Sequence, residues 1–129
     1  MSEGLADTSF FIAREAGRPL DADAIPDRLA VSVITLGELR AGVLAASDTA
    51  VRHRRLSTVG WVLRLDPLPI DDRVAETWAW LRIQLHEAGR RMPVNDSWIA
   101  ATAIALGLPV VTQDDDYSVD IPELEVIRV

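Results

Sequence analysis

The stretch WIAATAIALGLPVVT, residues 98–112, decides the fold class of this chain. Residues 98–106 are apolar on nearly every side of a helix, and such a helix is buried rather than laid on the surface. Gly107 is placed to end it in a left-handed conformation. Residues 109–112 then form a short β-branched run that predicts a buried strand. A buried helix followed directly by a buried strand indicates an α/β domain.

The same alternation extends in both directions along the chain. We expect strands at residues 4–6, 29–33, 65–70, 109–112 and 124–129, the third confined by Pro67 and Pro69 to a sheet edge or an irregular segment. We expect helices at residues 10–15, 36–46, 48–63, 73–88 and 96–106, and a helical turn within 24–29. Strands that alternate with helices predict a mostly parallel β-sheet flanked by helices on both faces.

Length and composition describe an ordinary globular chain. Its 129 residues, 49% hydrophobic and 26% charged, fit one domain over residues 1–129. No apolar run approaches the ~20 residues of a membrane-spanning helix. The N-terminal residues lack the pattern of a secretory signal, and there is no cysteine for a disulfide or a thiolate metal site. We therefore expect a cytoplasmic protein with no membrane association.

The charge pattern limits how the chain could meet nucleic acid. A net charge of −7 argues against passive, charge-driven adhesion to nucleic acid. It does not exclude an enzyme that acts on nucleic acid, because carboxylates that bind a divalent metal present less negative charge than their formal count. Every basic side chain other than histidine is an arginine, so any phosphate contact must use guanidinium groups.

Helix capping alone could explain the presence of Asp7 and of Glu38. Asp7 directly follows the first predicted strand and could cap the helix after it. Glu38 lies three residues after Thr35, which is the spacing of a capping box. Its neighbours are small or apolar, however, so this is not a freely solvated charged face.

Asp96 and the run Asp114–Asp116 could likewise have purely structural roles. Asn95 or Asp96 could cap the buried helix, and the run Asp114–Asp116 could be a solvated acidic turn after the strand ending at Thr112. The N-terminus of a buried helix should nevertheless point at something inside the fold.

Position along the fold joins these acids into one group. Asp7 and Asp114–Asp116 follow the carboxyl ends of strands, Glu38 lies shortly after another, and Asp96 heads a helix packed on the sheet. Loops and helix N-termini converge at that edge of an α/β sheet, which is where sites are built. Several carboxylates gathered there would repel one another and raise one another's pKa values. A divalent cation relieves this repulsion, and oxygen ligands without His or Cys favour Mg²⁺ or Mn²⁺.

Four short motifs carry a resemblance to a known family. They are Asp7–Ser9, Thr35–Leu39, Asn95–Ala101 and Val111–Tyr117. In order and content they resemble the four acidic motifs of PIN domains, and within that group the chain is most similar to the VapC toxins of toxin–antitoxin pairs. The resemblance covers essentially the whole chain.

The resemblance implies an Mg²⁺- or Mn²⁺-dependent endoribonuclease that acts on RNA, forms a homodimer and is bound by a cognate VapB-like antitoxin. It places the following residues in the site: Asp7, Glu38, Asp96, Asp114 and Asp116 as catalytic acids, Asp7, Asp96 and Asp114 as metal ligands, and Thr112 and Ser9 as supporting hydroxyls. Glu38 would orient or deprotonate the attacking water. The number of metal ions stays open.

Two positions depart from the family pattern. The last motif usually has an acid or amide followed by Asp-Phe. Here three aspartates precede Tyr117, which leaves open whether Asp114 or Asp116 is the fourth acid. The first strand is also short, because only three strand residues precede Asp7.

Other functions fit the sequence less well. An aspartyl-phosphate phosphatase or a receiver domain ordinarily uses a lysine, and the chain has none. A histidine-based ribonuclease mechanism is not expected, because neither His53 nor His86 lies in an acidic motif. A catalytically silent PIN-like module that only binds protein, and a metal-dependent DNA nuclease, stay open as alternatives.

Overall fold

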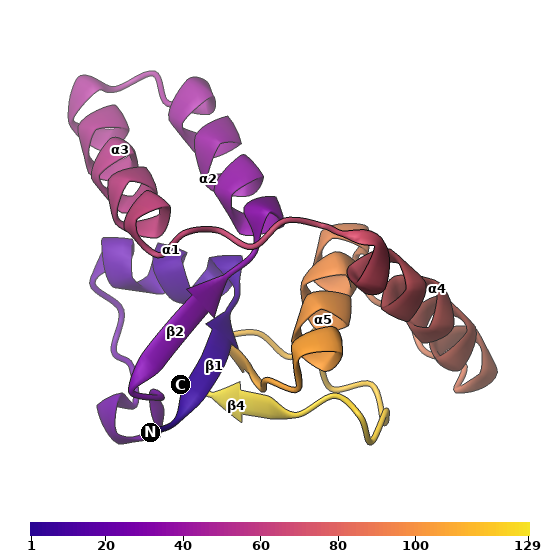
Figure 1. Ribbon diagram of the computed structural model, residues 1–129. Helices are drawn as coiled ribbons and strands as arrows, with labels where there is room; N and C mark the ends of the chain where they lie inside the picture. Colours follow the sequence, from indigo (N-terminus) through magenta and orange to yellow (C-terminus); the bar gives the residue numbers. More distant parts are fainter.

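Four short parallel strands form the centre of the computed structural model, which describes all residues 1–129. Along the sheet their order is β2-β1-β3-β4. The strands are β1 (Glu3–Ala6), β2 (Arg28–Val31), β3 (Val110–Thr112) and β4 (Val126–Arg128). The helices are α1 (Thr8–Ala16), α2 (Val33–Ala45), α3 (Thr49–Arg64), α4 (Asp72–Glu87) and α5 (Val94–Leu106), with a 3-10 turn at η1 (Ala22–Ala24). The predicted α/β class is confirmed (Figure 1).

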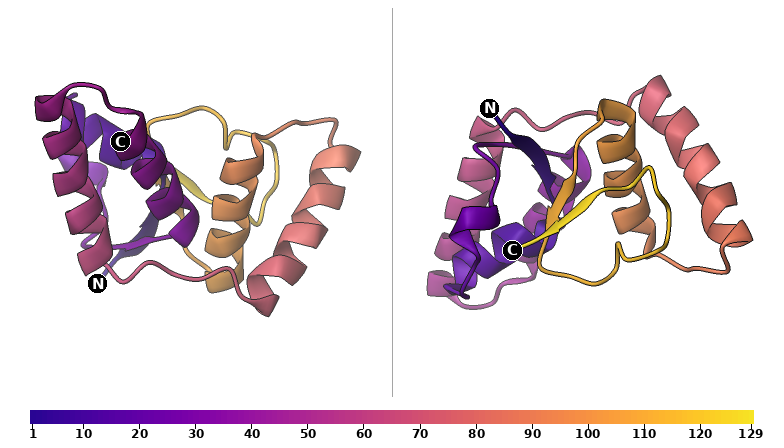
Figure 2. Two further views of the ribbon diagram at one scale, coloured as in Figure 1. Left: turned by 90° about the horizontal axis from the view of Figure 1, so that it is seen from above. Right: turned by 90° about the horizontal axis from the view of Figure 1, so that it is seen from below.

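Helices cover both faces of the sheet. Successive residues of a strand point to opposite faces, so neighbouring residues pack into different apolar clusters. Leu5 and Val110 are fully buried in an apolar cluster with residues of α4 and α5. Their neighbours Ala6 and Val111 are fully buried in a second cluster with residues of α1, α2 and α3. The views of Figures 1 and 2 show the same division, with α4 and α5 on one side of the strands and α1 and α3 on the other. Burial on both faces explains why consecutive residues of the central strands β1 and β3, such as Leu5 and Ala6 or Val110 and Val111, are apolar.

Most helix ends follow the predicted signals. The side chains of Asp7, Asp48 and Asp71 accept hydrogen bonds from backbone N–H groups at the starts of α1, α3 and α4. Gly17 and Gly107 take left-handed conformations and end α1 and α5. None of these helices combines the length and the apolar character needed to cross a lipid bilayer.

The predicted capping box of α2 is wrong. The N-cap is Ser32, whose hydroxyl accepts a hydrogen bond from the Ile34 N–H at 3.0 Å. The helix therefore begins before Thr35, and both Thr35 and Glu38 lie inside it. Their side chains are not needed at the helix end and are free to contact other elements.

The predicted cap of α5 is also wrong. This helix begins at Val94 after Pro93, which occupies the N-cap position without a side-chain hydrogen bond. Asn95 and Asp96 both lie in the first helical turn. Asp96 thus sits at the positive end of the helix dipole without serving as its cap.

Of the two alternatives expected for residues 65–70, an edge strand or an irregular segment, the structure shows the irregular segment. Only an isolated bridge joins Leu68 to Ser32, with Leu68 donating to the Val31 carbonyl at 2.8 Å and accepting from the Val33 N–H at 2.9 Å. The prolines on both sides of Leu68 cannot donate hydrogen bonds, so the pairing does not extend. The other differences concern bounds: the helical turn lies at Ala22–Ala24, earlier than expected, and the last strand spans Val126–Arg128.

Candidate active site

The carboxyl edge of the sheet gathers the predicted acids from four elements. Asp7 follows the central strand β1, and Asp114 and Asp116 follow its neighbour β3. Glu38 lies in the second turn of α2, which follows β2 on the other side of β1. Asp96 lies in the first turn of α5. Because all strands are parallel and β1 lies between β2 and β3, these loops and helix starts meet at one edge.

Asp7 is the buried centre of the group, with 1% of its surface exposed. Its Oδ1 accepts hydrogen bonds from the Ser9 hydroxyl at 2.7 Å and the Phe10 N–H at 3.1 Å. Its Oδ2 accepts one from the Thr112 hydroxyl at 2.7 Å. Burial raises the pKa of Asp7 above its usual value, although these three donors act in the opposite direction and the charge of Asp114 adds to the rise. Asp7 therefore caps α1 and also belongs to the acid cluster.

Two hydroxyl groups connect Asp7 to the loop after β3. The Ser9 hydroxyl donates to Asp7 and accepts from the Gln113 N–H at 3.0 Å. The Thr112 hydroxyl donates to Asp7 and accepts from the Asp114 N–H at 2.9 Å. Each hydroxyl thus uses its hydrogen for the carboxylate and its oxygen for the loop. This arrangement fixes where Asp114 starts relative to Asp7, as a supporting role for Ser9 and Thr112 requires.

Glu38 is half-buried and held from α1. The Thr8 hydroxyl donates to Glu38 Oε1 at 2.7 Å and lies 3.0 Å from the Thr35 hydroxyl. A hydroxyl has one hydrogen, so Thr8 donates to one of these two groups at a time. The sequence predicts a helix cap at Thr35 and indicates no separate role for Thr8. The polar run of residues 7–9 after a buried strand is the signal that could have indicated Thr8.

Asp96 faces the other acids from the start of α5. Burial is the main cause that raises its pKa to about 7, followed by the hydrogen-bonding and charge interactions with Asp116 and the charges of Asp7 and Glu38. Asp116, Asp7 and Glu38 therefore all act electrostatically on Asp96. The first helical turn provides a compensating positive potential for the Asp96 carboxylate.

The three consecutive aspartates point in different directions. Asp115 is exposed and pairs with the Arg128 guanidinium. Burial raises the pKa of Asp114, with the charge of Asp116 adding to the rise and the charges of Arg128 and Arg18 opposing it. Asp114 thus interacts by charge with Asp7, whereas Asp116 interacts with both Asp114 and Asp96.

Tyr117 is a residue of the site whose role the sequence analysis missed. It is 2% exposed, and its hydroxyl oxygen is buried without a hydrogen-bond partner of normal geometry. Burial raises its pKa well above the usual range, and the charges of Asp7, Asp96 and Glu38 add to this effect. Its departure from the family's usual phenylalanine was the available signal.

The chemistry of these groups fits a hard divalent cation. All the candidate ligands are carboxylate oxygens, which suit Mg²⁺ or Mn²⁺. Their mutual repulsion is the effect that a cation would relieve. As the side chains stand, no three acids form a group that could hold one ion. Binding would require the carboxylates to draw closer together.

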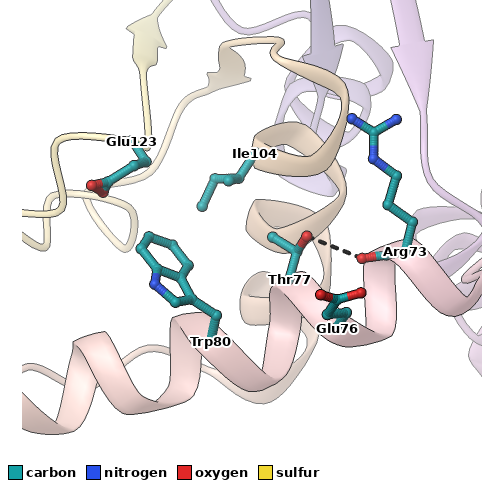
Figure 3. A pocket seen from close by; sticks show the side chains of 6 residues that line it. All are labelled: Arg73, Glu76, Thr77, Trp80, Ile104 and Glu123. Atoms are coloured by element: carbon teal, nitrogen blue, oxygen red, sulfur yellow. Dashed lines mark hydrogen bonds between the residues drawn. The ribbon is translucent and has the colours of Figure 1, made fainter.

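Two surface hollows of the molecule can be placed relative to the acids. The first, about 510 Å³, lies between α4, the end of α5 and the segment before β4, and none of the predicted acids lines it (Figure 3). Its lining residues are Arg73, Glu76, Thr77, Trp80, Ile104 and Glu123. A smaller hollow of about 180 Å³ is lined by residues of α1, α2 and α3, including Glu38 and Arg55. Glu38 therefore borders both the acid cluster and an open surface.

Comparison with known proteins agrees with this arrangement. Residues 5–120 match the PIN domain. The chain is 53% identical to Ribonuclease VapC5 of Mycobacterium tuberculosis, over 98% of this chain and 95% of the relative. It is 52% identical to Ribonuclease VapC4 of the same organism, over 97% and 95% of the two chains.

Solved structures show the same likeness in three dimensions. The crystal structure of VapBC-5 of Mycobacterium tuberculosis, a member of the VapBC family of toxin–antitoxin systems, aligns with a TM-score of 0.91 and 50% identity over the full length of both chains. DNA-bound VapBC of Salmonella typhimurium aligns with a TM-score of 0.79 and 27% identity over 98% of this chain and 97% of that one. The match extends over most of the sequence and the fold, and the chain belongs to the PIN domain family, in its VapC group.

Proposed function

We propose that this protein is a divalent-metal-dependent endoribonuclease and the toxin component of a type II toxin–antitoxin system. The observation that carries the proposal is the convergence of acids from β1, α2, α5 and the loop after β3 at one sheet edge. The relatives at 53% and 52% identity are named ribonucleases, which supports RNA as the substrate. Solved relatives described as VapBC complexes support a VapB-like antitoxin as partner.

In the proposed reaction, water attacks a phosphodiester of RNA and the P–O bond to the leaving oxygen breaks. Asp7, Asp96 and Asp114 would hold Mg²⁺ or Mn²⁺, with Asp116 beside them, and the bound cation supplies positive charge for the scissile phosphate and lowers the pKa of water. Glu38, oriented by Thr8, would accept the proton of the attacking water.

The other polar groups have positioning roles in this proposal. Ser9 and Thr112 keep Asp7 and the start of the Asp114–Asp116 run in fixed relative positions. The guanidinium groups of Arg18 and Arg128 act on Asp114, so positive charge flanks the acids where an RNA phosphate would approach.

The test is cleavage of structured and unstructured RNA by purified protein with Mg²⁺ or Mn²⁺ and with EDTA. We expect cleavage that needs the metal and is lost in Asp96→Asn. Glu3→Gln is the matched control, because it removes a carboxylate at the opposite end of β1 and should leave activity unchanged. Cleavage unaffected by EDTA contradicts the mechanism. Cleavage of single-stranded DNA alone indicates a DNA nuclease, and metal binding without cleavage of either polymer indicates a silent binding module.

The partner and the oligomeric state have separate tests. We expect a VapB-like antitoxin encoded beside this gene to co-purify with the protein and to inhibit its cleavage of RNA. We also expect a homodimer, in line with the exposed apolar side chains of Trp80, Ile83 and Leu106. Light scattering that gives a monomer at about tens of micromolar, a working range for weak self-association, contradicts the homodimer.

A further inference from the structure

A basic hollow lies where the end of α4 leads into α5. It has a volume of about 300 Å³, and its lining contains three arginines, one histidine and no acid: Arg82, Leu85, His86, Arg90, Arg91 and Met92. Arg82 and His86 lie one turn apart on α4, and Arg90 and Arg91 belong to the short connection to α5 (Figure 2). Because the chain as a whole has a net charge of −7, the basic hollow reverses the general charge of the protein at this place.

Stacked tryptophans hold one of these arginines in position. The Arg82 Cζ lies 5.4 Å from the centroid of the Trp78 ring, which is a cation–π distance. Trp78 stacks on Trp98 with ring centroids 4.2 Å apart, and its indole N–H donates to the Ser97 hydroxyl at 2.9 Å. Ser97 and Trp98 directly follow Asp96 on α5. The position of Arg82 is therefore tied to the part of α5 that carries Asp96.

The two arginines beyond α4 are accessible from solvent. Arg90 pairs with Asp120 at 2.5 Å, and the two side chains are 51% and 74% exposed. An ion pair this exposed contributes little to stability, so a phosphate could replace the carboxylate. Arg91 forms no ion pair with an acid of the chain. It lies five residues before Asp96, so the two Cα atoms are at most about 18 Å apart.

We propose that the basic hollow binds backbone phosphates of RNA a few nucleotides away from the bond that is cut. The inference rests on the proposed function, because it assumes that the scissile phosphate reaches Asp96. The acid cluster repels phosphates, whereas guanidinium groups bind phosphate oxygens through paired N–H donors. An RNA strand can meet Asp96 with one phosphate and the basic hollow with another, which favours RNA over an acidic protein as the occupant. Phosphate contacts supply affinity and register without reading the base sequence.

Arg82→Gln/Arg91→Gln removes two of the proposed contacts. Fluorescence anisotropy in EDTA, where the proposed reaction does not proceed, gives the Kd for labelled single-stranded RNA at several salt concentrations. We expect the Kd at low salt to rise by about tenfold or more, to a similar extent for RNAs of different sequence. The slope of log affinity against log salt should become shallower by about 1.4, since each phosphate contact to a single strand contributes about 0.7.

Two further variants separate the basic hollow from general effects of charge and folding. Arg54→Gln/Arg64→Gln is the matched control, because it removes two exposed arginines of α3 on the other side of the sheet. It should leave the Kd within about twofold of the wild type. Arg91→Gln alone spares the contact between Arg82 and Trp78, so it should keep the melting temperature and still reduce the salt slope by about 0.7.

The outcomes distinguish this inference from the proposed function. Weaker RNA binding and a shallower salt slope in both hollow variants, with the control unchanged, support the inference. They do so even if the wild type with Mg²⁺ or Mn²⁺ leaves the RNA intact and the ribonuclease proposal fails. A Kd within about twofold of the wild type for both hollow variants, or an equal loss in the control, overturns the inference even if RNA is cleaved. Tighter binding of polyglutamate than of RNA, lost in the hollow variants, indicates an acidic protein as the occupant and also overturns it.

Discussion

Replacing Asp96 by asparagine tests whether the acids form one repelling cluster. Burial and the neighbouring acids raise the pKa of Asp96 from 3.8 to about 7, which would correspond to about 4 kcal/mol of destabilisation of the ionised folded state. Asp96 is only half-buried, so screening by solvent reduces this to about 2 kcal/mol. The lost interaction of the carboxylate with the first turn of α5 opposes the gain by about 0.5 kcal/mol. We expect Asp96→Asn to stabilise the metal-free protein by about 1–2 kcal/mol.

This free energy is large enough to measure in a thermal melt. A chain of 129 residues has an unfolding entropy of about 0.27 kcal/mol per degree near its midpoint. The variant should therefore melt about 4–7 °C above the wild type in EDTA at about pH 8. Added Mg²⁺ or Mn²⁺ should stabilise the wild type and have much less effect on the variant, since binding to the folded state raises its stability.

The raised pKa of Asp96 determines how the stability of the protein changes with pH. The pKa of Asp96 in the folded state is raised, so between about pH 4 and about pH 7 the folded state binds more protons than the unfolded state. The contribution of Asp96 to stability therefore falls as the pH rises through this window. The advantage of Asp96→Asn should be full at about pH 8, clearly smaller at about pH 5 and absent only below about pH 4, where the wild-type carboxyl is protonated in both the folded and the unfolded state.

Glu3→Gln is the control for a general change in charge. Glu3 is exposed at the opposite end of β1, so its replacement should change stability by no more than about 0.5 kcal/mol at either pH. Asp96→Asn melting no higher than the wild type in EDTA at about pH 8 would refute the clustered-acid reasoning. A difference that persists unchanged at about pH 5 would also refute it.

Three further substitutions test the contacts around the cluster. Thr112→Val removes the 2.7 Å hydrogen bond to the buried Asp7 carboxylate, and urea titration should show a loss of about 1–3 kcal/mol together with weaker metal binding. Thr8→Val removes the donor to Glu38 and should lower the turnover number for RNA by about tenfold without changing the Mn²⁺ affinity, as measured by steady-state kinetics and calorimetry. Gly4→Ala places a Cβ 2.7 Å from a valine methyl of β3, and urea titration should show destabilisation of about 1–3 kcal/mol, whereas an unchanged midpoint would contradict this close packing.

The elements that could be predicted are those with local signals. The helix that ends at Gly107 and the strand that follows it combine an apolar pattern with a left-handed glycine, and both are present. For residues 65–70 the sequence left two alternatives, an edge strand or an irregular segment, because Pro67 and Pro69 interrupt the apolar run. Strand pairing depends on partners elsewhere in the chain, and the prolines on both sides of Leu68 leave a single bridge. Local pattern thus identifies an element where backbone hydrogen bonds are unobstructed and leaves alternatives open where proline removes the donors.

The side-chain network of the site depends on strand order, which the sequence does not contain. Acids after strands predict a shared edge for any parallel arrangement, so Asp7 and Asp114 could be placed together. The contact from Thr8 to Glu38 requires β1 and β2 to be neighbours, and the contact from Thr112 to Asp7 requires β3 on the other side of β1.

The two wrong caps follow from the same limit. A polar residue near the start of a helix can either cap that helix or contact residues of other elements. The local sequence indicates only the first of these roles, because the second depends on the tertiary fold. In α2, Ser32 provides the cap, so Glu38 is left to accept a hydrogen bond from Thr8 at the start of α1. In α5, Pro93 occupies the cap position without a side-chain bond, so Asp96 is left to face the other acids. An acid one turn inside a helix that already begins at another residue is therefore a stronger candidate for a site than an acid at the helix boundary itself.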